Sequence, residues 1–268
     1  MAEYSSNPVR VFFSSAVLAK RALFSWLRPE MWIMMLFFSS LFQIAFFVYV
    51  ATYVNNPSIS VAYVAVGNAM QSIALASVFA VCNITGEEKQ QGTLEPILVS
   101  PGNRFSIFVG RAMIQVLNGF ATVIIALFYA AVIFNVDFSR TDFLSLGLVA
   151  VVTAFAMTAF GLMLSSLGLY LRTSMVLANI FLFIGLLLCG VNFPVSYLPS
   201  YLQPFSYAIP MTYATEAARE AVSGSSVLSI GGLLLAELVV GIAAILVGYA
   251  MFLWFERVSK KRGTIDRY

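Results

Sequence analysis

Long apolar runs alternate with short polar segments along almost the whole of the 268-residue chain. A helix needs about 20 mainly apolar residues to cross the hydrocarbon core of a bilayer, and it satisfies its own backbone hydrogen bonds there. The pattern therefore predicts an all-α membrane protein that forms a single transmembrane domain over residues 1–268. The expected six spans are residues 32–54, 61–84, 112–136, 143–171, 174–191 and 227–255.

A different periodicity precedes the first span. In residues 8–28 apolar side chains recur at steps of three and four, and Arg10, Lys20, Arg21 and Arg28 occupy the remaining positions. This pattern predicts a basic amphipathic helix that lies in the membrane interface. The sequence leaves open whether this helix only anchors the chain or also contacts a cytoplasmic partner.

The positions of the basic residues predict the orientation of the spans. When the spans are taken in order, every lysine and arginine except Arg140 and Arg219 falls on one side. Because cytoplasmic segments retain basic residues, we expect both termini to lie in the cytoplasm. The expected location is the plasma membrane. The net charge of +3 is then explained by topology, and we expect no binding to nucleic acid.

The most polar interruption, residues 85–104, carries the signals of a folded elbow on the cytoplasmic side. Thr85 and Glu88 have the spacing of a capping box at a helix start, and Gly92 can end that helix. A second short helix can then begin at Thr93. A compact elbow held at the membrane surface could be gripped by another protein.

A second unusual stretch contains no charged residue between Thr173 and Thr215, which is too long for one span. Its prolines, which cannot lie inside one continuous helix, are Pro194, Pro199, Pro204 and Pro210. We expect residues 193–213 to form short broken helices that re-enter the outer leaflet, where such backbone must be surrounded by protein or line a cavity. An aromatic belt on the outer interface is the alternative.

Several polar side chains lie inside the spans, and five of them are candidates for a solute path, namely Gln43, Asn68, Gln71, Asn118 and Glu237. Amides in a bilayer usually bond across to neighbouring helices, and lining a solute path is the alternative. Glu237 is an intramembrane carboxylate, which suggests a functional role by default, although it could equally pair with a neighbouring helix.

The chain lacks the residues of a stand-alone enzyme. It has no histidine, the usual general base and metal ligand. None of its lysines follows a glycine, so it has no phosphate-cradling P-loop. We therefore expect no catalytic residues, no metal site and no cofactor in this chain. An ion-coupled carrier would normally show several ionisable groups within its spans. This chain shows one acidic residue well inside a span, Glu237, which disfavours that class of protein.

Two segments carry a resemblance to a known family. Residues 87–98 read Glu-Glu-Lys-Gln-Gln-Gly-Thr-Leu-Glu-Pro-Ile-Leu and are followed by Ser100-Pro101. They resemble the Glu-x-x-x-Gly-Thr-Leu-Glu-x-Leu…Pro segment of type-2 ABC exporter permeases. Residues 193–213 are similar to the second signature of that family, before its last span. The Gly-Thr-Leu-Glu form resembles the drug and antibiotic exporter branch more than the polysaccharide branch.

The resemblance implies a permease subunit of an ATP-driven exporter. Residues 85–104 would then be the coupling elbow, seated in a separate ATP-binding subunit that carries the ATP and magnesium. The ATPase-coupling residues would be Thr85, Glu87, Glu88, Gly92, Thr93, Leu94, Glu95, Pro96 and Arg104. The outer gate would be Phe193, Pro194, Leu198, Pro199, Phe205 and Pro210.

The same resemblance implies the assembly. Two permease chains, identical or related, would pair around a central path above two ATP-binding subunits, with membrane lipids around them. A path lined by aromatic residues, methionine and a few amides would suit an amphipathic, drug-like or lipid-like solute. The alternatives are an exporter of a lipid-linked saccharide, an ABC-linked membrane sensor, or an ATP-independent channel or carrier.

Overall fold

The computed structural model describes residues 8–26, 28–54, 56–90, 92, 96–97, 104–167 and 174–262. Within these residues it contains helices and no strands, which confirms the all-α prediction. The elements are α1 (Pro8–Trp26), α2 (Pro29–Val54), α3 (Val61–Gln90), α5 (Arg104–Val132), α6 (Phe143–Leu167), α7 (Ser174–Leu188), the 3-10 helix η1 (Val195–Tyr197), α8 (Gln203–Tyr207), α9 (Pro210–Val222) and α10 (Val227–Arg262).

Five of these helices, α2, α3, α5, α6 and α10, are long and apolar enough to cross a membrane. The expected fifth span corresponds to α7, which has 15 residues. At 1.5 Å per residue α7 is about 22 Å long, shorter than the hydrocarbon core of about 30 Å. The count of six full spans is therefore not confirmed, and the last residues of the expected fourth span, 168–171, lie outside the described residues.

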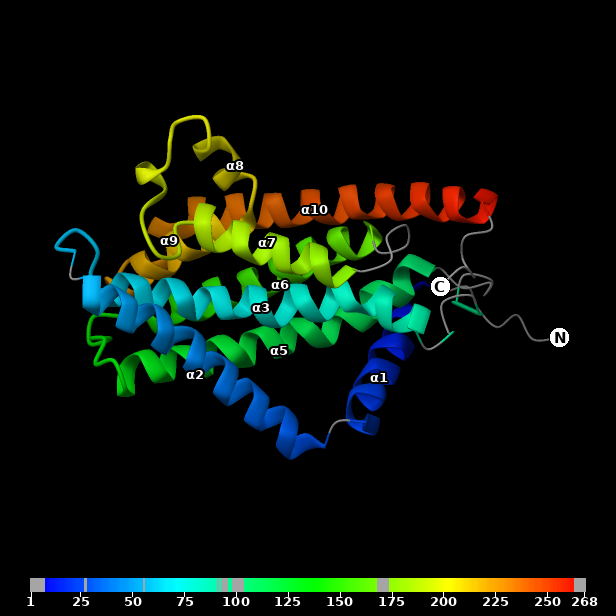
Figure 1. Ribbon diagram of the computed structural model, residues 1–268, viewed down its shortest axis with the longest axis horizontal. Coiled ribbons are helices and arrows are strands. Elements are labelled where there is room, and N and C mark those ends of the chain that lie inside the picture. Colours follow the sequence, from blue (N-terminus) through cyan, green and yellow to red (C-terminus); the bar gives the residue numbers. More distant parts are fainter. Residues whose placement is uncertain are drawn as a thin grey trace.

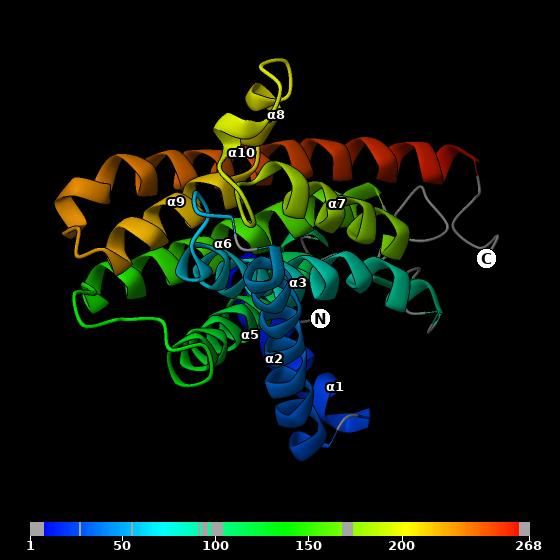
Figure 2. The same ribbon diagram turned by 60° about the vertical axis from the view of Figure 1, so that its left-hand side comes forward.

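The long helices lie side by side along the long axis of the molecule (Figure 1). The turn between α2 and α3, the loop between α5 and α6, and α8 lie toward one end, and α1 lies toward the other. We call these the outer and inner ends, following the charge-based orientation. From its junction with α3, α2 runs obliquely away from the other helices (Figure 2).

The centre of the bundle is formed by α3 and α6. In their most apolar stretches, 78% of the residues of α3 and 61% of those of α6 are buried, against 22% for α2 and for α10. Both central helices are rich in small side chains, which permit close helix approach in a membrane. Two small residues near the inner end of α6, Gly161 and Ser166, are buried against neighbouring helices in this way.

Glycines set the contact between α6 and α10. A Cβ atom at Gly241 of α10 would lie 3.0 Å from the Cα of Ala156, and one at Gly248 would lie 2.9 Å from the Cα of Met163. At the second of these contacts the Ser166 hydroxyl donates to the Gly248 carbonyl oxygen at 3.0 Å. These two helices therefore pack with their backbones in near contact.

The predicted amphipathic helix, α1, packs against α5 near the inner end. A Cβ atom at Gly110 of α5 would lie 2.4 Å from the Phe12 carbonyl oxygen and 2.9 Å from the Cβ of Ser15. The apolar side chains Val9, Phe13 and Val17, which are more than half exposed, follow a four-residue step along another face. That stripe agrees with a helix that also contacts lipid.

Replacing Gly110 with alanine should detach α1 from α5 because the new methyl group has no room beside Phe12. We expect the free energy of unfolding to fall by about 1 to 3 kcal/mol, as in other overpacked contacts, measured by thermal unfolding in detergent micelles. The matched control is Gly232→Ala in α10, where nothing lies within 4 Å of the added Cβ. Equal stability of the two variants would contradict the tight α1–α5 contact.

Candidate functional site

The predicted coupling elbow follows directly from α3. The expected second span ends at residue 84, but α3 continues as one helix through Thr85 to Gln90. Thr85 therefore does not start a new helix, which differs from the capping-box expectation. Gly92 has a φ of 68°, the left-handed conformation that ends helices. Its predicted role as a stop is confirmed.

The rest of the elbow is described only in part. Pro96 and Ile97 are helical, and Arg104 is the first residue of α5. Thr93, Leu94 and Glu95 lie outside the described residues, and so do the side chains of Thr85, Glu87, Glu88 and Arg104. Their assignment to ATPase coupling remains a prediction.

Ile97 connects the elbow to the core. It packs against a cluster at the inner end that contains Val81 of α3, Phe108 of α5 and Phe252 of α10. The rings of Phe108 and Phe252 meet edge to face with centroids 5.3 Å apart. A displacement of the elbow would therefore act on three long helices at once.

The predicted outer gate is a chain of turns and short helices between α7 and α9. Gly190 turns the chain with a φ of 67°, and Pro210 forms the first turn of α9, where its missing N–H costs nothing. Between them η1 and α8 project away from the long helices at the outer end (Figure 1). The segment with the four prolines is therefore divided into short helices, and its re-entry into the outer leaflet remains a prediction.

The gate segment has one side held by protein and one side exposed. Leu198 is buried, and its carbonyl oxygen accepts a hydrogen bond from Gln203 Nε2 at 2.9 Å. Tyr197, Tyr201 and Phe205 are more than half exposed. Both sequence interpretations thus have support: the segment packs partly on protein, and its aromatic residues face outward as a belt would. Among the other predicted gate residues, Pro199 is exposed, and Phe193 and Pro194 are half-buried.

A cluster that the sequence analysis missed joins the gate to α3. Arg219 of α9 donates from Nη2 to the carbonyl oxygens of Gly190 at 2.8 Å and Val191 at 2.9 Å. Its Nε and Nη2 also donate to the Tyr63 carbonyl oxygen at 3.3 and 3.2 Å. We call Arg219, Tyr63, Gly67, Gly190 and Val191 the outer clamp.

Tyr63 and Gly67 complete the outer clamp from the α3 side. The guanidinium carbon of Arg219 lies 3.4 Å from the centre of the Tyr63 ring, a cation–π contact. The Tyr63 hydroxyl donates to the Gly190 carbonyl oxygen at 3.0 Å. A Cβ atom at Gly67 would lie 2.1 Å from the Val191 carbonyl oxygen and 2.5 Å from Arg219 Nη2, so glycine is required there.

The three-residue spacing of Arg219 and Glu216 in the sequence would allow these two residues to pair. In the structure Arg219 forms no ion pair within the described residues and is turned toward the carbonyl oxygens instead. This difference has a physical reason. A partly buried guanidinium group is more stable where several fixed carbonyl dipoles replace its lost contacts with water. One indication of this contact was present in the sequence: Arg219 and Arg140 are the only basic residues in the segments expected on the outer side.

The predicted solute-path residues do not gather in one place. Gln43 Nε2 donates to Asn68 Oδ1 at 3.2 Å, and Asn68 Nδ2 donates to Asn192 Oδ1 at 2.8 Å. This chain ties α2 to α3 and to the gate segment, in line with interhelical bonding, the alternative that the sequence left open. Asn118 bonds instead to Gln115 on its own helix at 3.2 Å.

Three predicted path residues have buried oxygens without a partner among the described residues: Asn118, through its Oδ1, and the fully buried Gln71 and Glu237. Gln71 of α3 lies opposite Gly185 of α7, and its Oε1 accepts no hydrogen bond within the described residues. Glu237 of α10 is fully buried, and neither of its carboxyl oxygens has a partner there. The neighbouring Thr153 of α6 directs its hydroxyl to the Val149 carbonyl oxygen at 2.7 Å. Pairing of Glu237 with a neighbouring helix, one of the alternatives that the sequence left open, is therefore not seen in the described part of the chain.

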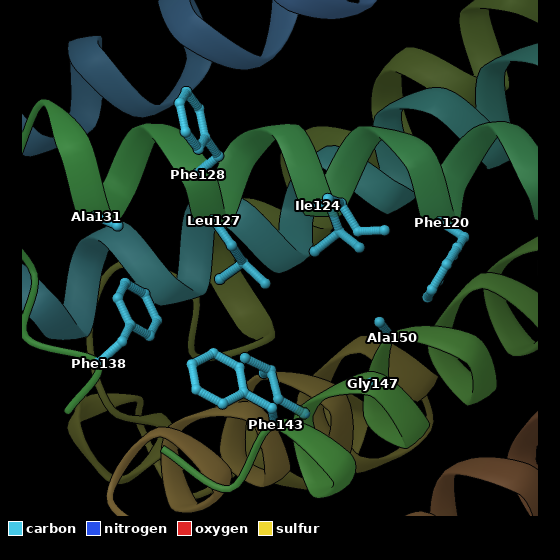
Figure 3. A pocket seen from close by; sticks show the side chains of 11 residues that line it. Phe120, Ile124, Leu127, Phe128, Ala131, Phe138, Phe143, Gly147 and Ala150 are labelled. Atoms are coloured by element: carbon cyan, nitrogen blue, oxygen red, sulfur yellow. The ribbon is translucent and has the colours of Figure 1, made fainter. Parts of the chain in front are cut away.

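An apolar groove of about 440 Å³ lies between α5 and α6. Phe120 and Leu127 of α5 point toward α6, where Phe143 and Ala150 lie (Figure 3). Gly147 also lines the groove, and nothing lies within 4 Å of a Cβ atom built there. The groove can hold an apolar group that reaches it from the lipid.

Comparison with known proteins agrees with this architecture. A sequence model of the family described as ABC-2 type transporter matches residues 15–222 of the chain. The chain is 26% identical over 172 residues to the protein named "Probable multidrug ABC transporter permease YbhR" of Escherichia coli (strain K12). The protein of the same name from Escherichia coli O157:H7 matches to the same extent. The match covers 62% of this chain and 45% of each relative, so the chain spans about half the length of these relatives.

Substituting Gly67 with alanine should force the outer clamp apart because its Cβ would overlap the Val191 carbonyl group. We expect the free energy of unfolding to fall by about 2 kcal/mol through overpacking and lost hydrogen bonds, measured by thermal unfolding in micelles. Gly231→Ala in α10, where the added Cβ meets nothing within 4 Å, is the matched control. An unchanged unfolding temperature for Gly67→Ala would refute the close approach.

Proposed function

Because the chain belongs to the ABC-2 type transporter family, a family of permease subunits that are not themselves catalytic, we propose that it is the membrane subunit of an ATP-driven exporter. ATP would bind and be hydrolysed on separate ATP-binding subunits at the inner end, and a second permease chain would complete the path. The exported solute would leave past the predicted outer gate. The plasma membrane and cytoplasmic termini, inferred from the basic residues, belong to the same proposal.

The observation that carries this proposal is the continuity of α3. Its 30 residues correspond to about 45 Å of helix. At its outer end Tyr63 and Gly67 belong to the outer clamp, which holds the gate segment. At its inner end it runs directly into the elbow that resembles the family's coupling segment. One stiff element therefore joins the proposed input to the proposed output.

The energy for switching would enter through the elbow. A ligand shifts a conformational equilibrium only by its difference in binding free energy between the two states. ATP-driven closure of the partner subunits would supply that difference, provided that they grip Glu87, Glu88 and Glu95. Gly92 and Pro96 would give the elbow its fixed shape. The packing of Ile97 on the inner cluster supports transmission to α3, α5 and α10.

The solute class is proposed as amphipathic, drug-like or lipid-like. The apolar groove between α5 and α6 offers a membrane-facing surface that such a solute could reach after it partitions into the bilayer. The multidrug description of the similar permease supports the same class. Export of a lipid-linked saccharide and a non-transporting sensor role are the competing functions, and solute flux in vesicles distinguishes transport from sensing.

The double substitution Glu88→Ala/Glu95→Ala should separate the permease from its ATP-binding subunit, because it removes two of the three acidic groups of the elbow. We expect the wild-type chain to co-purify with an ATP-hydrolysing subunit from detergent-solubilised membranes. The double variant should lose that subunit or retain it with ATP hydrolysis no longer coupled to transport. The measurement is a pull-down followed by an ATPase assay.

Glu216→Ala/Glu220→Ala is the matched control, since it removes the same charge from exposed or half-exposed positions of α9 at the outer end. It should leave co-purification intact. A permease that purifies alone and transports at full rate would contradict the proposal and favour an ATP-independent channel or carrier.

Filling the apolar groove should impair handling of an amphipathic solute. Gly147→Phe places a ring in open space between α5 and α6, so we expect a severalfold lower rate of export of an amphipathic dye from vesicles, with complex assembly unchanged. Leu148→Phe, at the next and more exposed position of α6, is the control. Equal export rates for both variants would show that the solute does not use the groove.

A further inference from the structure

The outer clamp leaves one side of the half-buried Arg219 guanidinium group without a protein partner among the described residues. A guanidinium group has five N–H donors, and the bonds of Arg219 use only Nε and Nη2. Its Nη1 donates no hydrogen bond to any residue that the structure describes. Burial lowers the pKa of Arg219 to about 10, opposed by Tyr63 and Glu216, so the group remains charged at neutral pH. Glu216 is exposed and forms no ion pair with it.

A pocket of about 450 Å³ adjoins this cation at the outer end. Three separate segments line it: the start of α3, the loop between α5 and α6, and the end of α9. Its polar lining residues are Ser60, Tyr63, Asp137, Arg140, Arg219 and Ser223. A polar pocket that contains a half-buried arginine differs in kind from the apolar groove between α5 and α6.

The charge in this pocket is positive, with two guanidinium groups against one carboxylate. Arg140 is exposed and forms no ion pair in the described part of the chain. Asp137 is engaged in its own turn, where its Oδ1 accepts the Ser139 backbone N–H at 2.8 Å. That hydrogen bond holds the pKa of Asp137 below its usual value, so Asp137 stays negative and offsets only one of the two arginines.

The framework around the pocket is fixed by hydrogen bonds. The Asp142 backbone N–H donates to the Ala221 carbonyl oxygen at 3.0 Å, which ties the loop to α9. The carboxylate of Asp142 caps the start of α6 through the Ser145 hydroxyl at 2.9 Å and the Leu144 N–H at 3.0 Å. Arg140 is therefore held beside α9 by its backbone, with its side chain free to turn toward a ligand.

We propose that this pocket binds a phosphate-type oxyanion between Arg219 and Arg140. Planar guanidinium groups recognise such oxyanions by paired, charge-assisted hydrogen bonds, and Ser60 and Ser223 add hydroxyl groups to the lining. The anion would neutralise the excess charge and strengthen the link between α3, α9 and the gate segment. Its source is either the headgroup of an outer-leaflet phospholipid or a free oxyanion. The proposal does not depend on ATP-driven export.

The test uses the full-length purified chain in detergent, with two probes. Inorganic phosphate is titrated against chloride at equal ionic strength and followed by calorimetry and thermal unfolding. Dioleoylphosphatidylglycerol is titrated separately and counted by native mass spectrometry. Arg140→Gln removes one guanidinium group from an exposed position, so the variant should fold. Arg257→Gln, an exposed arginine near the inner end, is the matched control.

We expect Arg140→Gln to weaken binding by at least about tenfold, the loss of one charge-assisted hydrogen-bonded contact, and Arg257→Gln to leave it unchanged. Binding of phosphate that is lost in Arg140→Gln identifies a free oxyanion site. Binding of the lipid alone, lost in the same variant, identifies a headgroup site. No binding of either probe, or binding that Arg140→Gln does not weaken, would overturn the proposal.

Discussion

The rest of the structure depends on the close burial of α3 among its neighbours. In hydrocarbon there is little hydrophobic force between helices, so their association relies on packing and interhelical hydrogen bonds. On α3 both occur together: Gly67 admits the Val191 backbone, and Asn68 bonds to Gln43 and Asn192. From the other side Gly119 of α5 admits Ser77 of α3, with 2.5 Å between the Ser77 oxygen and a Cβ atom built on that glycine. This central helix can move only if its neighbours move with it.

The outer clamp explains how an irregular segment persists beside this helix. In the gate segment the backbone carbonyl groups of Gly190 and Val191 have no hydrogen-bond partner within a helix, as they would have in a regular one. Arg219 satisfies both, and the partial burial of its charge is tolerated because the carbonyl dipoles and the Tyr63 ring replace water. The same geometry leaves one side of the guanidinium group unsatisfied beside a polar pocket. Gate stability and the proposed anion recognition therefore share one side chain, Arg219.

The general form of this fold could be predicted from the sequence. Apolar runs located the long helices, the prolines located the break before α9, and Gly92 located the end of α3. These signals are local, because they depend on length, on a missing N–H or on a positive φ. The end of the second helix was less well predicted: α3 continues past Thr85 to Gln90, since polar residues can extend a helix beyond the membrane.

Contacts between distant residues could not be predicted in this way. Arg219 lies 156 residues from Tyr63 in the chain, and its three-residue spacing to Glu216 suggested a different partner. In the sequence nothing distinguishes Gly67 and Gly110 from other helix glycines, because the residues that they contact are distant in the chain. The intramembrane amides were correctly singled out as polar positions, but the sequence could not decide between interhelical bonding and a solute path, because that choice depends on which helices meet.

The central claim is that a displacement of the elbow is transmitted to the outer gate through α3. Cys189 is fully buried and directly precedes the gate segment, so Cys82→Ala makes it the sole thiol of the chain. The direct measurement is the rate at which a membrane-impermeant maleimide labels Cys189 in vesicles that contain the permease and its ATP-binding subunit. The account predicts faster labelling during ATP turnover, with the acceleration lost in Glu88→Ala/Glu95→Ala. A labelling rate independent of ATP would contradict the claim.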